Sequence, residues 1–199
     1  MNATLDRLDA DTHARILEGG IIPKSGINEA LSHERPKAII LGGQPGAGKG
    51  GLVRTTKAEL AFDVVPIDPD ALRDFHPDVA RFRSETPYTW SGRTHADASA
   101  WADELLEATV KGRKNLIFDT TLSNGEWAAG LIDDLQAKGY DVEVRAIAAH
   151  RLESELGVEK RFTEKLDLEG HARYVPASAR DAIYGKLGAS LDTIHARAC

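Results

Sequence analysis

A glycine-rich loop in the first quarter of the chain has the residue types and spacing of a phosphate-binding site. Gly43, Gly48 and Lys49 match the pattern G-x-x-x-x-G-K. Glycines let successive backbone N–H groups point inward at one anion, and a helix that begins near Lys49 adds the partial positive charge of its N-terminus. Lys49 would supply a full charge to the β- and γ-phosphates of a nucleotide. The alternative is a glycine-rich turn that joins a strand to a helix and binds nothing.

The segments on either side of this loop favour the phosphate site over the plain turn. The apolar run 37–41 reads as a strand, and Leu52, Val53 and Leu60 mark an amphipathic helix after the loop. We therefore predict that the loop binds a nucleoside triphosphate. The residues expected to contact the nucleotide are Gly43, Gln44, Pro45, Gly46, Ala47, Gly48, Lys49, Gly50 and Gly51.

Position 50 departs from the common pattern. Gly50 stands where a Ser or Thr usually ligates Mg²⁺, although nucleoside-monophosphate kinases also have a glycine there. Mg²⁺ would then be held by water, by the phosphates and by carboxylates from other segments. Asp119, which ends the apolar run 116–118, is a candidate for holding the metal through water. The alternative for Asp119 is an ordinary strand-end residue that starts a turn.

Two aspartates follow another predicted strand. Asp68 and Asp70 would lie at the carboxyl edge of the sheet, where open α/β sheets bind ligands. A carboxylate there can orient a hydroxyl group and accept its proton during phosphoryl transfer. The sequence Asp-Pro-Asp is also a good helix start, so the alternative is that either aspartate merely caps the helix that begins at Pro69.

Short apolar runs alternate with helical stretches from Lys37 onward. The predicted strands are 37–41, 62–67, 115–118 and 141–147, and the predicted helices between them are 49–60, 97–111 and 126–138. This alternation predicts an α/β, three-layer fold of the P-loop kinase-like type, with a mostly parallel sheet flanked by helices.

The two ends of the chain are expected to pack on this core as parts of one domain, 1–199. We expect an N-terminal helical arm over 1–35, with a helix at 3–18 that Gly19-Gly20 ends, followed by a loop. Two further helices are predicted near the C-terminus. Their apolar stripes are Leu152, Leu156, Phe162 and Leu166 in the first, and Ala179, Ile183, Leu187, Leu191 and Ile194 in the second.

Composition restricts the class of protein. With 25 basic and 31 acidic residues the net charge is −6, which disfavours nucleic acid as a partner. No apolar run approaches the roughly 18 residues that a membrane span needs, and the N-terminus has no signal-peptide pattern. The one cysteine, Cys199, excludes an intramolecular disulfide. We expect a cytoplasmic protein that binds neither membrane nor nucleic acid.

Several blocks of the sequence resemble the zeta toxin family of kinases. Gly-Gly-Gln-Pro-Gly-Ala-Gly-Lys at 42–49 is similar to its phosphate loop, and so are Pro66-Ile-Asp-Pro-Asp70, the His-Pro pair at 76–77 and the segment 135–140. The resemblance spans about 37–181. It implies an ATP- or GTP-dependent kinase, with Mg²⁺, that phosphorylates a hydroxyl group of UDP-N-acetylglucosamine. It also implies a small antitoxin partner that covers the nucleotide site.

The resemblance implies roles for individual acidic and polar residues. It places the catalytic base at Asp70, with Asp68 among the substrate contacts. It also implies a functional acid at Asp119, a polar substrate contact at Thr121 and an acidic one at Asp103. For Asp103, which lies about 200° around its helix from Trp101, a solvated position is an equal alternative.

Two arginines are expected to stabilise the transferring phosphoryl group together with Lys49. By resemblance, Arg161 and Arg173 belong to a lid segment after the fourth strand, and a planar, always-charged guanidinium suits the charge that spreads over phosphoryl oxygens. Arg161 lies about 180° from Leu152 on its helix, so an ordinary solvated arginine is the alternative.

Other functions remain open on the residues alone. The chain would also suit another P-loop kinase that acts on a nucleotide, a nucleotide cofactor or an antibiotic. Because Gly50 lacks the metal-binding hydroxyl, a non-catalytic nucleotide-binding module is a further alternative. Tyr88, Trp90 and His95 would either form a platform for a base or sugar or simply pack a loop-rich stretch.

Overall fold

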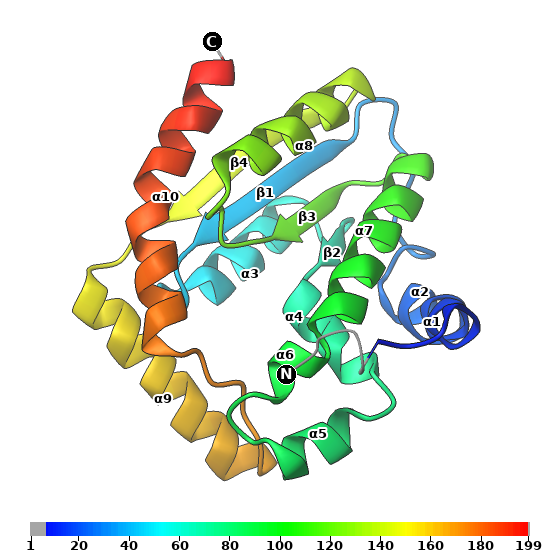
Figure 1. The fold of residues 1–199 in the computed structure, drawn as a ribbon. Helices are drawn as coiled ribbons and strands as arrows, with labels where there is room; N and C mark the ends of the chain where they lie inside the picture. Colours follow the sequence, from blue (N-terminus) through cyan, green and yellow to red (C-terminus); the bar gives the residue numbers. More distant parts are fainter. Residues whose placement is uncertain (1–6, 199) are drawn as a thin grey trace.

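Four parallel strands form a sheet at the centre of the molecule (Figure 1). The computed structural model describes residues 7–198. In spatial order the strands are β2 (Val65–Ile67), β3 (Leu116–Asp119), β1 (Lys37–Gly43) and β4 (Asp141–Ile147). β2 is shorter than the predicted strand 62–67, because Ala61 and Phe62 take left-handed backbone conformations, with φ of 51° and 62°, in the preceding turn. The predicted parallel sheet is confirmed.

Helices cover both faces of this sheet, as the three-layer prediction requires. Helix α3 (Lys49–Glu59) packs on one face, and α7 (His95–Lys111) and α8 (Gly125–Ala137) pack on the other. Alternate residues of β1 point to opposite faces. Ile39 and Leu41 belong to the smaller cluster under α3, whereas Ala38 and Ile40 belong to the larger cluster with α7 and α8.

Short helices and two long ones surround the carboxyl ends of the strands. On the β2 side lie α4 (Pro69–Leu72), the 3₁₀ turn η2 (Arg73–Phe75), α5 (Val79–Glu85) and α6 (Trp90–Arg93). On the β4 side lies α9 (Arg151–Glu169), and α10 (Ala177–Ala198) then returns along α8 (Figure 1). None of the described helices combines the length and the apolar character needed to cross a membrane.

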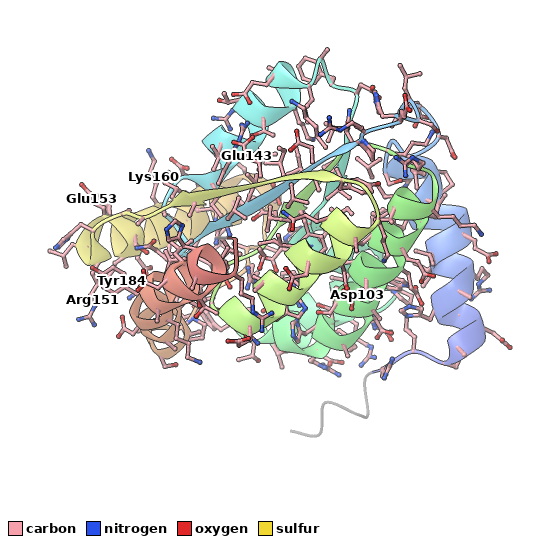
Figure 2. The ribbon with its side chains drawn as sticks, turned by 90° about the horizontal axis from the view of Figure 1, so that it is seen from above. Asp103, Glu143, Arg151, Glu153, Lys160 and Tyr184 are labelled. Carbon is pink, nitrogen blue, oxygen red and sulfur yellow. The ribbon has the colours of Figure 1, made fainter. Side chains whose placement is uncertain are left out.

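The predicted apolar stripe of α9 is wrong. Leu152 and Leu156 are 66% and 69% exposed, whereas the buried side chains of this helix are Ser154 and Val158. Small groups face inward here because the helix backbone comes very close to the glycine-rich loop. Figure 2 shows exposed residues of the same helix, such as Lys160, at the periphery of the molecule.

The predicted stripe of α10 is only partly right. Leu187 and Ile194 are buried and Leu191 is partly buried, as expected. Ala179, however, is exposed, while the polar residues Arg180 and Ser190 are buried. Ser190 packs directly against α8, where a glycine at position 125 leaves room for its backbone.

The N-terminal arm consists of α1 (Ala10–Ile16), the π-helical turn η1 (Leu17–Ile21) and α2 (Ile22–Lys24). The predicted helix end at Gly19-Gly20 is wrong, because the helical path continues through both glycines. Packing explains the continuation: Gly20 lies against the Phe75 ring and Ile21 is 1% exposed. The predicted helix start at residue 3 lies outside the described residues, but the helix prediction is wrong for residues 7–9. These are not helical, because the side chain of Asp9 accepts a hydrogen bond from the backbone N–H of Thr12 and caps α1 at its N-terminus.

A polar contact fastens this arm to α7. His13 lies between two carboxyl groups, with Nδ1 3.0 Å from Asp97 Oδ1 and Nε2 3.1 Å from Glu104 Oε2. The same imidazole stacks on Trp101, with ring centroids 4.9 Å apart. Asp97 is fully buried and also accepts a hydrogen bond from the backbone N–H of Leu8.

Candidate active site

The loop between β1 and α3 has the backbone geometry of a phosphate-binding loop. Gly46 and Gly48 adopt φ of 79° and 95°, conformations that residues with a side chain rarely take. Gly48 is also the N-cap of α3, so the N-terminus of that helix, with its unpaired N–H groups, faces the loop. This arrangement suits a triphosphate.

The lysine of the loop lies beside the end of β3. Lys49 Nζ is 2.8 Å from the carbonyl oxygen of Thr120 and 3.2 Å from Asp119 Oδ1. The sheet brings these groups together, because β1 and β3 are neighbours and Leu41 is in register with Asp119. Nucleotide phosphates would compete with Asp119 for this lysine.

Of the two aspartates after β2, only Asp68 acts as a helix cap. Its side chain accepts a hydrogen bond from the backbone N–H of Asp70, 2.8 Å away, at the start of α4. Burial raises the pKa of the Asp68 carboxyl, and the nearby carboxylates of Asp119 and Asp70 raise it further. The structure thus leaves Asp70 free of capping.

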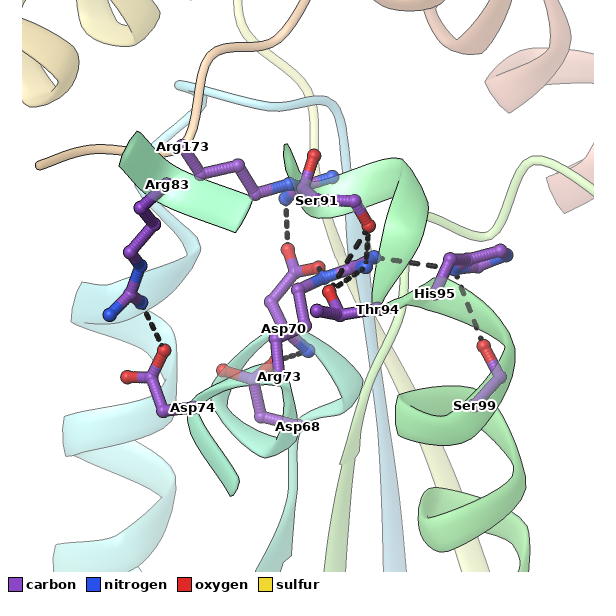
Figure 3. Close-up of polar contacts among 10 residues, drawn as sticks. All are labelled: Asp68, Asp70, Arg73, Asp74, Arg83, Ser91, Thr94, His95, Ser99 and Arg173. Atoms are coloured by element: carbon purple, nitrogen blue, oxygen red, sulfur yellow. Dashed lines mark hydrogen bonds and ion pairs between the residues drawn. The ribbon is translucent and has the colours of Figure 1, made fainter. Parts of the chain in front are cut away.

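Asp70 is held between two guanidinium groups (Figure 3). Its Oδ1 accepts a hydrogen bond from Arg73 Nε at 3.0 Å, and its Oδ2 accepts one from Arg173. Burial tends to raise the pKa of Asp70, but Arg173 and then Arg73 outweigh that effect and lower it. Asp70 therefore stays ionised at neutral pH.

Arg73 is a residue that the sequence analysis missed. It is 5% exposed and also reaches Thr94 Oγ1 at 3.3 Å and His95 Nδ1 at 3.2 Å (Figure 3). Burial, together with Arg73, lowers the pKa of His95, so the imidazole is neutral and accepts the hydrogen bond. The i, i+3 spacing of Asp70 and Arg73 at a helix start was the signal for this pair.

Arg161 lies on the inward side of α9. It follows Ser154 and Val158 by seven and three residues, so it shares their helix face and not the outward face of Leu152. Partial burial of the guanidinium lowers the pKa of Arg161, and the positive charge of Arg173 lowers it further. The carboxylate of Asp70 has the opposite, smaller effect. Within the described chain Arg161 forms no direct ion pair, and its side chain remains accessible to solvent.

Of the two other predicted substrate contacts, Thr121 lies near Lys49 and Asp103 lies far from it. Thr121 follows Asp119 and its hydroxyl lies 2.9 Å from Ser123 Oγ, on the loop beside Lys49. Asp103 lies on the exposed side of α7. Partial burial raises the pKa of its carboxyl group, and the neighbouring carboxylate of Glu104 raises it further. In Figure 2 Asp103 lies across the molecule from α9, so the structure does not bring it to the other site residues.

Helix α9 is also fixed to the phosphate loop by hydrogen bonds. Ser154 Oγ donates to the carbonyl oxygen of Pro45 at 2.6 Å, and just before the helix Gln44 Nε2 donates to the carbonyl oxygen of Ala149 at 2.6 Å. Gly157 faces Gly46 at the same contact. Sequence reasoning missed Ser154 and Gly157, although an isolated glycine inside a helix is a signal of close packing.

A glycine-rich loop that leads into a helix, a lysine at the helix start and acidic residues at the ends of adjacent parallel strands define a P-loop protein of the kinase-like kind. Residues 24–199 match the family model described as Zeta toxin. The chain belongs to the zeta toxin family.

Known relatives agree with this assignment. The chain is 32% identical over 170 residues to the Toxin zeta of Streptococcus agalactiae, which covers 83% of this chain and 58% of that protein. It therefore spans little more than half the length of that relative. Among solved structures, one from the PezAT chromosomal toxin–antitoxin system of Streptococcus pneumoniae has a TM-score of 0.83 at 23% identity, over 100% of this chain and 76% of that chain. The AvrRxo1-ORF1–ORF2 complex with ATP has a TM-score of 0.66 at 19% identity, over 94% and 58%.

Proposed function

We propose that this protein is a phosphotransferase that moves the γ-phosphate of ATP or GTP to a hydroxyl group of a UDP-amino sugar, with UDP-N-acetylglucosamine as the acceptor. One observation carries the proposal: the ionised Asp70, paired with Arg73 and Arg173, lies at the same sheet edge as the phosphate loop and Lys49. Membership of the zeta toxin family supports the acceptor class.

In this proposal Asp70 is the catalytic base. It accepts the proton of the acceptor hydroxyl while that oxygen bonds to the γ-phosphorus and the bond from phosphorus to the nucleoside diphosphate breaks. A weakly basic carboxylate is sufficient, because phosphoryl transfer passes through a loose transition state in which the proton leaves late. The ion pairs to Arg73 and Arg173 fix the direction in which the carboxylate points.

Cationic side chains stabilise the phosphoryl group in transit. Lys49 exchanges Asp119 for the β- and γ-phosphates when the nucleotide binds. Arg161, which has no direct ion pair in the described chain, is available to the transferring group, and Arg173 lies beside it. Thr121 and Asp68 line the acceptor side in this arrangement, and the exposed Asp103 would contact only a distant part of the acceptor.

Mg²⁺ would be held mainly by the nucleotide. Within the described part of the chain no group of three or more His, Cys, Asp or Glu residues is arranged to hold a metal ion. Magnesium often binds through one or two carboxylates, with phosphates and water as its other ligands. Asp119, partly buried beside Asp68, suits that role through water, and the ion would neutralise phosphate charge.

An antitoxin protein that covers the nucleotide site is the proposed partner. The similarity in fold to a structure from the PezAT toxin–antitoxin system supports this proposal.

ATP is the proposed phosphate donor. The similarity in fold to the AvrRxo1-ORF1–ORF2 complex, which contains ATP, supports this choice.

A transfer assay tests the proposal. The protein is incubated with Mg²⁺ and either ATP or GTP in the presence of UDP-N-acetylglucosamine, nucleoside monophosphates, nucleotide cofactors or antibiotics, and products are identified by mass spectrometry. We expect phosphorylated UDP-N-acetylglucosamine, lost in Lys49→Ala and retained in Lys186→Ala, a control on exposed α10. Phosphorylation of another acceptor would contradict the acceptor class, and nucleotide binding without transfer to any acceptor would favour a non-catalytic module.

A further inference from the structure

Three aromatic rings from three separate segments meet near the carboxyl end of the sheet. Tyr88 lies in the turn between α5 and α6, Phe162 on α9, and Tyr174 between α9 and α10. The Tyr88 ring stacks on Phe162 at 5.9 Å and meets Tyr174 edge-on at 5.8 Å, and Phe162 meets Tyr174 edge-on at 5.4 Å. Stacked and edge-to-face arrangements are those that aromatic pairs prefer. We call these three residues the aromatic clasp.

The clasp joins the two sides of the proposed active site. Phe162 directly follows Arg161, and Tyr174 directly follows Arg173, so each arginine proposed to stabilise the phosphoryl group has a clasp ring as its neighbour in sequence. Figure 1 shows the C-terminal part of α9 beside α5. A contact at Tyr88 therefore restrains both arginine-bearing segments at once.

A hydrogen bond strengthens the same junction. The indole Nε1 of Trp90, a buried residue at the start of α6, donates to the carbonyl oxygen of Ala172 at 3.0 Å. This bond fixes the backbone one residue before Arg173. The α5–α6 side thus holds the Arg173 segment through its backbone and through the Tyr174 ring.

Tyr88 lies at the surface and is not part of the hydrophobic core. Tyr88 is 61% exposed, so little of its ring surface is buried and its loss would not unfold the sheet. No described residue forms a hydrogen bond with its hydroxyl group. The ring of Tyr88 therefore serves mainly to join the α5–α6 turn to Phe162 and Tyr174.

We propose that Tyr88 is a positioning residue, which holds Arg161 and Arg173 over the phosphate loop through Phe162 and Tyr174. The proposal rests on the proposed function for what the two arginines do. In this arrangement the three ring contacts keep both guanidinium groups close to the transferring phosphoryl group.

Kinetics of Tyr88→Ala and Tyr88→Phe test this role. The Ala variant loses two ring contacts, so we expect kcat to fall about tenfold while KM for nucleotide and acceptor changes less than about twofold. The Phe variant keeps the ring and should match the wild type. Phe62→Ala, which removes an aromatic side chain that is 74% exposed outside the clasp, is the control and should have no effect. In an Arg161→Ala background the loss caused by Tyr88→Ala should be smaller.

A second measurement does not depend on activity. Hydrogen exchange of the ligand-free protein should be faster over residues 161–175 in Tyr88→Ala and should return to the wild-type rate in Tyr88→Phe. Unchanged exchange in Tyr88→Ala would overturn the inference even if the protein proves to have a different activity. A raised KM for the acceptor with unchanged kcat would also overturn it, since Tyr88 would then be a platform for the acceptor ring.

Discussion

Gly46 and Gly157 touch backbone to backbone. A Cβ atom on Gly157 would lie 2.3 Å from the carbonyl oxygen of Gly46, and one on Gly46 would lie 2.2 Å from the carbonyl oxygen of Ser154. At these two glycines the phosphate loop and α9 therefore meet without a side chain between them. Since Arg161 lies one helical turn beyond Gly157, its position is tied to that of the loop.

Gly157→Ala should separate the loop from α9. Rotation of a side chain cannot relieve a clash between a methyl group and backbone, so we expect a stability loss of about 1–3 kcal/mol and ATP affinity lowered about tenfold or more by the displaced loop. Thermal unfolding and calorimetric titration with ATP measure the two effects. Gly188→Ala on α10, where a Cβ would meet no atom within 4 Å, is the matched control and should be neutral or slightly stabilising. Wild-type ATP affinity in Gly157→Ala would contradict this account.

Asp70→Asn should abolish turnover more severely than Asp68→Asn. Loss of a general base costs about 10²–10⁴-fold in rate, and the Asn variant also loses the ion pairs to Arg73 and Arg173. Asp68→Asn keeps the helix cap, because Asn caps as well as Asp does. Steady-state kinetics with the acceptor that the transfer assay identifies compare the two variants. If Asp68→Asn is the inactive variant and Asp70→Asn turns over normally, the roles of the two aspartates are exchanged.

The stability conferred by Asp70 should depend on pH in a definite direction. The pKa of Asp70 is lowered from its ordinary value of 3.8 in the folded protein, so its ion pairs stabilise fully above that value. The contribution disappears as pH falls through the lower, folded-state pKa. Urea unfolding of the wild type and Asp70→Asn should therefore differ most near neutral pH and converge below about pH 4. A difference that stays constant over this range would exclude the ion pairs as its cause.

Gly50→Ser should supply the hydroxyl group that the phosphate loop lacks. The site has room, since the nearest atom to a Cβ at position 50 is the Arg54 Nη1 at 3.8 Å. We expect the Mg²⁺ concentration for half-maximal ATP binding to fall several-fold, because a serine at this place ligates the metal directly. Gly50→Ala is the control that changes helix propensity without adding a ligand. Equal behaviour of the two variants would mean that position 50 does not face the metal.

The fold and the phosphate loop could be predicted because their signals are local. The strand at 37–41, the glycine spacing and Lys49 lie within a few residues of one another, and helix–strand alternation fixes a parallel sheet. The pairing of β1 with β3, which brings Asp119 to Lys49, is seen only in the structure.

The position of α9 could not be predicted from its apolar residues. Leucines at 152 and 156 suggested the buried face, but the helix packs through Ser154 and Gly157 on a loop that lies over a hundred residues earlier in the chain. Hydrophobic periodicity finds faces that bury large side chains, and it overlooks faces where two backbones meet. Arg73 was missed for a related reason, since its partners Thr94 and His95 come from a distant segment.

The buried carboxyl group of Asp97 makes the N-terminal arm indispensable to the rest of the chain. Its partners, the Leu8 amide and His13, both lie before residue 24, where the match to the family begins. In a shortened protein that starts at that residue, the buried carboxyl group would keep only the His76 imidazole, whose Nε2 lies 3.8 Å from Asp97 Oδ2, as a partner. Such a truncation should aggregate or unfold at room temperature, and Asp97→Asn should only partly rescue it.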